Sequence, residues 1–179
     1  MLTSLFEIES KLGKQRTSWR AMNCFISFYL YDKNKRNFAL REATALVKLW
    51  KSKKYKVSLF EPSSFSGAIG GCQALPSSFL AYGVDANSDS IIDIKSLADN
   101  LGFIANYLAK HLGKGKVTQR AIERAIYAYN PGHAYVTYVL TLKSEIKKEK
   151  ITLEFVNLVN DSLLSIPKLV TRPYLVTRE

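Results

Sequence analysis

Glu9 is the residue of this sequence whose surroundings best suit acid–base chemistry. In a helix, its neighbours four residues before and three residues after are Leu5 and Leu12, so Glu9 lies on the apolar stripe and Glu7 does not. Burial against a core disfavours the carboxylate and raises its pKa, which is the state that a general acid needs near neutral pH. The alternative on periodicity alone is a buried glutamate paired with one of the many basic residues.

A second stretch follows the opening of a calcium-binding loop. Asp85, Asn87 and Asp89 stand at its first, third and fifth positions, and their oxygen atoms are typical calcium ligands. Ser90 occupies the sixth position, where glycine usually makes the sharp turn, and Ser96 the twelfth, where an acid is usual. The pattern alone indicates either a calcium site or a polar surface turn.

A third stretch, residues 64–79, is dense in small residues and reads Ser-Phe-Ser-Gly-Ala-Ile-Gly-Gly-Cys-Gln-Ala-Leu-Pro-Ser-Ser-Phe. Its glycines permit another molecule to approach the backbone closely, and Gln73 offers both a hydrogen-bond donor and an acceptor. Taken alone, the run predicts a loop before a helix.

Several other chemistries are absent from the sequence. His111 and His133 are the only histidines, they are far apart, and no nearby Ser or Cys motif makes a hydrolase triad. Residues 113–116 read Gly-Lys-Gly-Lys but lack the spacing of a phosphate-binding loop. Cys24 and Cys72 form neither a disulfide framework nor a metal-ligand pair at useful spacing.

The elements that must position these residues are predicted to be helices in a single domain, which is what 179 residues allow. Thr118 is predicted to cap one helix, and Gly113 to end the helix before it. Apolar residues recur at helical spacing in the first segment and in residues 38–53, 97–108, 121–129 and 135–146. The sequence therefore predicts an all-α domain, and a small hairpin in the loop of residues 83–96 stays open.

The charge balance points to a polyanionic partner. Lys and Arg number 26 against 15 for Asp and Glu, so the formal net charge is +11. Nucleic acid, an anionic membrane surface and an acidic cell-wall polymer all fit such a surface. The apolar stretches are too short to span a membrane, and the first residues lack the pattern of a signal peptide.

Five motifs follow one another in the order of a known enzyme family. They are Glu-Ser-Lys-Leu-Gly at 9–13, the small-residue run at 67–79, Tyr-Gly-Val-Asp at 82–85, Ala-Asn-Tyr-Leu at 105–108 and Ala-Tyr-Asn at 128–130. Together they resemble the lytic murein transglycosylases of the membrane-bound B type, within the goose-type lysozyme-like superfamily. The resemblance implies an all-α, lysozyme-like fold with a cleft between two lobes.

The resemblance also implies a role for particular residues. Glu9 matches the catalytic acid/base of the family. The residues that match groups lining the saccharide cleft are Ser64, Gln73, Tyr107, Tyr129 and Asn130. The residues that match calcium ligands are Asp85, Asn87, Asp89, Ile91 through its carbonyl, and Asp99. Asp99 supplies the acid that the simple loop template lacked, so calcium is the expected structural cofactor, with no organic cofactor.

The activity that the resemblance implies is that of a lyase on peptidoglycan. Such an enzyme cleaves the β-1,4 bond between N-acetylmuramic acid and N-acetylglucosamine and leaves a 1,6-anhydro end. The expected partners are glycan strands, with an anionic membrane surface as a second partner and no nucleic acid, in the bacterial periplasm or cell envelope. The alternatives are a hydrolytic lysozyme and a catalytically inactive glycan-binding module on the same scaffold.

The chain departs from the family pattern in ways that concern the cleft. Ala74 replaces an aromatic residue, and the aromatic pair expected after Lys35 and Arg36 is reduced to Phe38 followed by Ala39. Stacking on sugar rings is therefore expected to be weaker or relocated. Residues 1–150 are predicted to be the catalytic domain, without the N-terminal part of the usual domain, and residues 151–179 a helical or extended tail of unassigned role.

Overall fold

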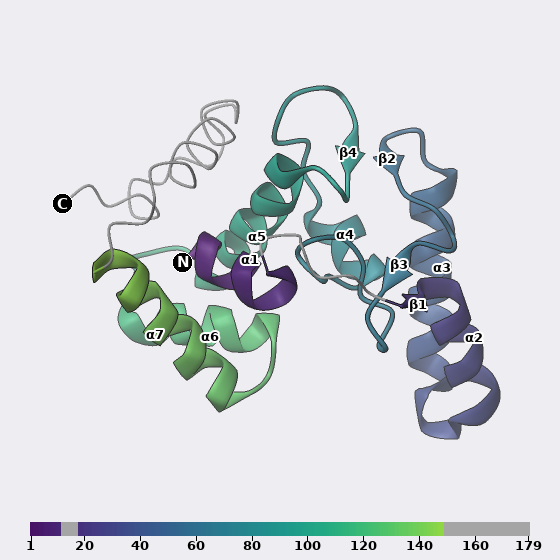
Figure 1. Ribbon diagram of the computed structural model, residues 1–179, viewed down its shortest axis with the longest axis horizontal. Helices are drawn as coiled ribbons and strands as arrows, with labels where there is room; N and C mark the ends of the chain where they lie inside the picture. The colour runs from purple at the N-terminus through teal and green to yellow at the C-terminus, as the bar shows by residue number, and fades with distance from the viewer. Residues whose placement is uncertain (12–17, 149–179) are drawn as a thin grey trace.

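The computed structural model describes residues 1–11 and 18–148, and within them it is mostly helical (Figure 1). The predicted tail at residues 151–179 and the position of Leu12 lie outside the described residues. The helices are α1 (Leu2–Ser10), α2 (Ala21–Tyr31), α3 (Arg36–Lys51), α4 (Pro76–Tyr82), α5 (Leu97–Leu112), α6 (Gln119–Tyr129) and α7 (His133–Lys148), with a 3-10 turn η1 (Lys33–Lys35). The predicted all-α class is confirmed.

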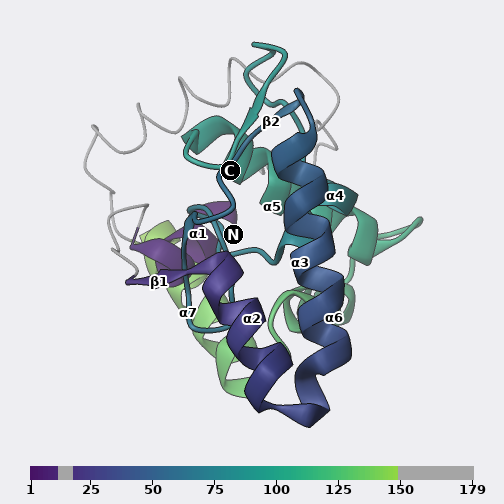
Figure 2. The same cartoon turned by 90° about the vertical axis from the view of Figure 1, so that its right-hand side faces the viewer.

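The helices fall into two groups. In Figure 1, α2 and α3 form one end of the molecule and α6 and α7 the other, with α4 and α5 between them. Figure 2 faces α2 and α3, which pack side by side, and α3 in turn packs on α4. Helix α1 packs against both α7 and α5, so the helix that carries Glu9 belongs to the second group.

One hydrophobic core connects the two groups. Its largest fully buried side chains include Phe25 from α2, Leu46 and Leu49 from α3, and Phe79 from α4. The ring of Phe79 lies 4.7 Å from that of Phe103 on α5, centroid to centroid. The core therefore fixes α5 and the loop before α4 relative to both ends of the molecule.

The predicted helix ends agree with the structure. Thr118 caps α6, because its hydroxyl accepts a hydrogen bond from the backbone N–H of Ala121. Gly113 ends α5 with a φ of 74°, a conformation that glycine adopts at little cost. In the same way the Ser96 hydroxyl caps the start of α5 by accepting from the Asp99 N–H.

The short strands differ from the expectation. The structure shows no hairpin within residues 83–96; instead β4 (Ile92–Asp93) pairs in parallel with the distant β2 (Tyr55–Lys56). A second pair joins β1 (Trp19–Arg20) to β3 (Pro62–Ser63) in antiparallel register. Both pairings are long-range, so no local turn signal predicts them.

No helix in the described part of the chain is long and apolar enough to cross a lipid bilayer.

Candidate active site

Glu9 lies in the last turn of α1, partly buried, beside the fully buried Leu5. The phenol of Tyr135, in the first turn of α7, donates a hydrogen bond of 2.5 Å to Glu9 Oε1. Burial raises the pKa of Glu9, and the bond from Tyr135 partly opposes that rise because it favours the carboxylate. The geometry thus supports the predicted environment, with a tyrosine rather than a basic residue as the hydrogen-bond partner.

Two further tyrosines extend this cluster. The Tyr129 hydroxyl donates a hydrogen bond of 2.5 Å to the Cys72 carbonyl. Burial raises the pKa of Tyr129 well above its ordinary value, and the nearby Cys72 and Glu9 add to that rise. The ring of Tyr107 lies 5.0 Å from that of Tyr129. The structure therefore groups Tyr107 and Tyr129 with Glu9 and Tyr135.

Sequence reasoning missed Tyr135 as a site residue. In the sequence it is one apolar position in the periodic pattern of residues 135–146, and nothing local distinguishes it from Tyr138. The contact depends on the packing of α1 against α7, which brings together residues that are 126 positions apart.

The small-residue loop packs directly against the helix that carries Glu9. A Cβ atom on Gly71 would lie 2.7 Å from the ring of Phe6 on α1, so only glycine allows this approach. Backbone hydrogen bonds between Ile69 and Ala74 close the loop from both sides. The run therefore forms a compact turn ahead of α4, which agrees with the predicted loop before a helix. The close approach that Gly71 permits is that of the protein's own Phe6.

Gln73 points its side-chain amide at its own loop. Its Nε2 donates a hydrogen bond of 2.8 Å to the Gly70 carbonyl, and its backbone has a φ of 47°. Gln73 is next to Cys72, whose carbonyl binds Tyr129, and so it lies at the edge of the tyrosine cluster. The amide donor is engaged in holding the turn.

Asn100 joins this loop to the start of α5. Its buried Oδ1 accepts a hydrogen bond of 2.9 Å from the Cys72 N–H. Its Nδ2 donates to the carbonyls of Ile94 and Ser96, at 2.9 and 2.6 Å. One side chain thus connects the turn beside Glu9 with the end of the predicted calcium loop.

The other two predicted cleft residues are Ser64 and Asn130. Ser64 follows β3, where its hydroxyl accepts from the Ala68 N–H at 3.1 Å and lies 2.9 Å from the Ser66 hydroxyl. Asn130 ends α6 and is exposed. Their roles as cleft residues remain predictions.

The predicted calcium ligands lie in a tight turn. Ser88 and Ser90 have φ values of 61° and 71°, so Ser90 adopts the conformation for which calcium loops use glycine. The carboxylate of Asp85 accepts from the Ser90 N–H at 2.8 Å, and that of Asp89 from the Ile91 N–H at 2.8 Å. The Asn87 amide donates to Asp89 at 2.9 Å.

Asp99 contributes to this turn from α5. It is buried, and its two oxygens accept from the backbone N–H groups of Ala86 and Asp93. Burial raises its pKa, and the nearby Asp85 and Asp89 raise it further. Within residues 1–11 and 18–148, no group of three or more His, Cys, Asp or Glu side chains is arranged to hold a metal. The oxygen donors nevertheless suit a hard cation, and a shared positive charge would relieve this crowding of carboxylates.

Solved structures share this fold. The lytic transglycosylase SltB1 from Pseudomonas aeruginosa superposes with a TM-score of 0.72 at 19% identity, covering 82% of this chain and 68% of that chain. The Escherichia coli lytic transglycosylase Slt35 in complex with calcium gives 0.71 at 18% identity, with 79% and 63% covered. SltB3 from Pseudomonas aeruginosa, in complex with NAG-anhNAM-pentapeptide, gives 0.66 at 20% identity, with 77% and 53% covered. No curated protein sequence gives a significant match.

The fold is thus that of the lysozyme-like lytic transglycosylases, as the motifs predicted. The chain belongs to the transglycosylase SLT domain family, which matches residues 1–123. Membership of this family makes it an enzyme domain of the peptidoglycan-cleaving lyases.

Proposed function

We propose that this domain cleaves the β-1,4 bond between N-acetylmuramic acid and N-acetylglucosamine with Glu9 as its sole acid/base, and that the product carries a 1,6-anhydro end. The observation that carries the proposal is the partly buried Glu9 carboxyl, held by Tyr135 in a cluster of tyrosines. Two SltB3 structures support the substrate class, because they contain NAG-NAM-pentapeptide and NAG-anhNAM-pentapeptide. The first ligand is a fragment of the strand and the second has the anhydro end.

In this mechanism one carboxyl group serves two steps. Protonated Glu9 donates its proton to the glycosidic oxygen while the bond from that oxygen to C1 of the muramic acid breaks. The Glu9 carboxylate then accepts the proton of the C6 hydroxyl as its oxygen bonds to C1. Most glycosidases need a second carboxylate as nucleophile or to activate water; here the C6 hydroxyl of the substrate takes that place. Glu9 ends protonated and ready for another cycle.

Tyr135 contributes position and electrostatics. Its hydrogen bond fixes one carboxyl oxygen, which leaves the other to face the glycosidic oxygen. A fixed carboxyl matters because a displacement of about 1 Å can cost about 100-fold in rate. Tyr135 also stabilises the carboxylate that forms after the first proton transfer.

We further propose that calcium binds the loop from Asp85 to Asp99 and stabilises the fold. The ligands would be the side chains of Asp85, Asn87, Asp89 and Asp99 and the Ile91 carbonyl. Support comes from the turn at Ser90, from the crowding of carboxylates around Asp99, and from the calcium complex of Slt35. When bound, the ion would supply positive charge to the loop and would take no part in the proposed reaction.

We propose the peptidoglycan of the bacterial envelope as the place of action. The fold, the family and the excess of basic residues all suit an anionic cell-wall polymer. The same charge suits an anionic membrane surface beside the wall.

Mass spectrometry of peptidoglycan digested by the protein tests the proposed function. We expect muropeptides that end in 1,6-anhydro-N-acetylmuramic acid, one water lighter than reducing ends, and no such products from Glu9→Gln. Glu7→Gln, on the same helix, is the matched control and should digest as the wild type does. Reducing ends would indicate a hydrolase, and binding without products from the wild type an inactive module.

A further inference from the structure

An aromatic hollow opens between β1, the first turns of α2 and the turn after β3. It has a volume of about 220 Å³. That is below the roughly 300–1,000 Å³ of pockets that enclose a whole small-molecule ligand, so the hollow suits one ring of a longer molecule. The side chains that line it include Trp19, Arg20, Asn23, Ser27, Phe28 and Phe65.

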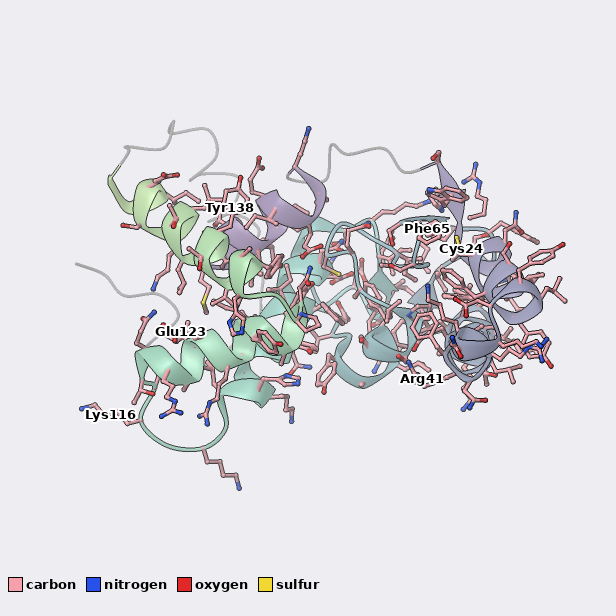
Figure 3. The ribbon with its side chains drawn as sticks, turned by 90° about the horizontal axis from the view of Figure 1, so that it is seen from below. Cys24, Arg41, Phe65, Lys116, Glu123 and Tyr138 are labelled. Atoms are coloured by element: carbon pink, nitrogen blue, oxygen red, sulfur yellow. The ribbon has the colours of Figure 1, made fainter. Side chains whose placement is uncertain are left out.

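Three of these side chains form an ordered aromatic wall. Trp19 and Phe65 meet edge to face with ring centroids 5.4 Å apart, and Phe65 meets the buried Phe28 in the same way at 5.4 Å. Trp19 is nevertheless 51% exposed and Phe65 58% exposed. Figure 3 shows Phe65 beside Cys24 of α2, at the opposite end of the molecule from Tyr138. Rings that are held by packing and still accessible form a preorganised stacking surface.

The polar residues of the hollow determine which ligand fits it. Arg20, Asn23 and Ser27 line the hollow together with the aromatic side chains and provide guanidinium, amide and hydroxyl groups. No Asp or Glu is among the lining residues. A sugar ring presents C–H groups on its faces, which stack on aromatic rings, and hydroxyl and N-acetyl groups on its edge, which need such partners. A purely apolar ligand would leave these polar groups unpaired.

Backbone pairing connects the hollow with the loop beside Glu9. Trp19 pairs with Ser63, Ser63 bridges to Ile69, and Ile69 bridges to Ala74, the residue after Gln73. Trp19 and the turn that packs on α1 are thus joined by one small ladder of backbone pairs. A glycan strand that followed this ladder from Glu9 would pass the hollow.

We propose that the Trp19–Phe65 hollow binds an N-acetylated sugar ring of the glycan strand, away from the two rings whose bond is broken. The ligand class rests on the proposed function. The hollow would supply aromatic contact that Ala74 cannot.

Tryptophan fluorescence and calorimetry test this assignment. The chain has two tryptophans, and Trp50, which is half exposed on α3, provides the matched control. Soluble N-acetylglucosamine oligomers are added to the Glu9→Gln protein, so that binding is measured without turnover. We expect a spectral response that persists in Trp50→Phe and is lost in Trp19→Phe.

Calorimetry on the same background measures the affinity itself. Trp19→Ala and Phe65→Ala are each expected to weaken binding by about tenfold, as the loss of a central aromatic contact does, whereas Trp50→Ala leaves it unchanged. Melting curves show whether each variant is folded, and Phe65→Leu replaces Phe65→Ala if that variant is unfolded. Unchanged affinity in the folded Trp19→Ala protein, or a response that comes from Trp50, overturns the proposal.

Activity assays separate this proposal from the proposed chemistry. With Glu9 intact, Trp19→Ala should raise KM on long strands and leave kcat and the anhydro products unchanged. If wild-type digestion instead gives reducing ends, the proposed reaction fails, while the binding results still decide the role of the hollow. An unchanged KM of Trp19→Ala on long strands would contradict the proposed role of the hollow and would leave the proposed reaction at Glu9 unaffected.

Discussion

The burial of the Glu9 carboxyl is expected to make the stability of the protein depend on pH. Its pKa is raised in the folded protein from an ordinary value of 4.5, so the folded state holds the proton more tightly than the unfolded state. The free energy of unfolding therefore falls as pH rises from the unfolded pKa through the folded pKa. We expect the melting temperature of Glu9→Gln to rise relative to the wild type across this window. A difference in melting temperature between Glu9→Gln and the wild type that stays the same at all pH values would contradict this expectation. Glu7→Gln serves as the control.

In the proposed mechanism, Tyr135 would influence the upper pH limit of activity as well as the position of Glu9. The acid must be protonated, so activity should fall as pH rises through the pKa of Glu9. Tyr135→Phe removes the hydrogen bond that lowers this pKa. We expect the alkaline limb of the kcat profile to move to higher pH and kcat to fall by roughly 10- to 100-fold. Tyr138→Phe, on the exposed side of the same helix, should change neither quantity; a limb that moves to lower pH would exclude the proposed role.

Gln73 is a residue for which the structure refines the expectation. The resemblance suggested a contact with the saccharide, whereas its Nε2 binds the Gly70 carbonyl and its φ is 47°. We expect Gln73→Ala to lower stability by about 1 kcal/mol through the lost hydrogen bond. Gln73→Gly should recover part of this loss, because glycine adopts a positive φ at little cost. Melting curves check the expected order of stability, which is wild type, then Gln73→Gly, then Gln73→Ala. Reduced turnover in a Gln73→Ala protein as stable as the wild type would instead support direct contact with the glycan.

Among the helices, α4 depends on a carboxylate from another element. Glu42 on α3 is fully buried and accepts hydrogen bonds from the Ser77 N–H at 2.9 Å and the Ser77 hydroxyl at 2.8 Å. The negative charge also faces the positive end of the α4 dipole. We expect Glu42→Ala to reduce the free energy of unfolding by about 1–3 kcal/mol. Chemical denaturation measures this, with the exposed Thr44→Ala as control; a change no larger than that control would show that α4 needs no such cap.

Helices with one apolar face and a capping residue could be predicted from the sequence. Residues 97–108 and 121–129 show helical periodicity, and Gly113 and Thr118 mark ends that the structure confirms. Helix α2 was missed because its sequence, Ala-Met-Asn-Cys-Phe-Ile-Ser-Phe-Tyr-Leu-Tyr, is apolar on nearly every side and shows no clear period.

The predicted site divides in the same way. Glu9 could be identified because its neighbours along the helix are apolar. The small-residue loop could be identified because glycine lacks a Cβ atom and therefore marks places where the backbone packs tightly. The partner of Glu9 could not, since the contact with Tyr135 depends on how α1 docks on α7. The parallel pair of β2 and β4 was missed for the same reason.

At the scale of the whole molecule, calcium is expected to act on stability. Burial raises the pKa of Asp99, and repulsion from Asp85 and Asp89 raises it further. An ion shared by the three carboxylates would reduce that repulsion. We expect the melting temperature to rise at millimolar calcium, the range of extracellular calcium modules, and to fall with a chelator. Asp89→Ala should abolish the difference, whereas Asp32→Ala, beside η1, should retain it. A melting curve that does not respond to millimolar calcium would exclude a structural ion in this loop.

Asn100 connects the proposed calcium loop with the turn beside Glu9 through its hydrogen bonds. Calcium binding could therefore affect glycan binding as well as stability. Any effect of one bound ligand on the affinity for a second ligand must be matched by an equal effect in the other direction. If calcium tightens the hold of the turn on a glycan strand, the strand must tighten the hold of the loop on calcium by the same factor. Bound to the wall, the domain would then keep its ion at calcium concentrations where the free domain loses it. The cell wall would act as an effector of the enzyme as well as its substrate.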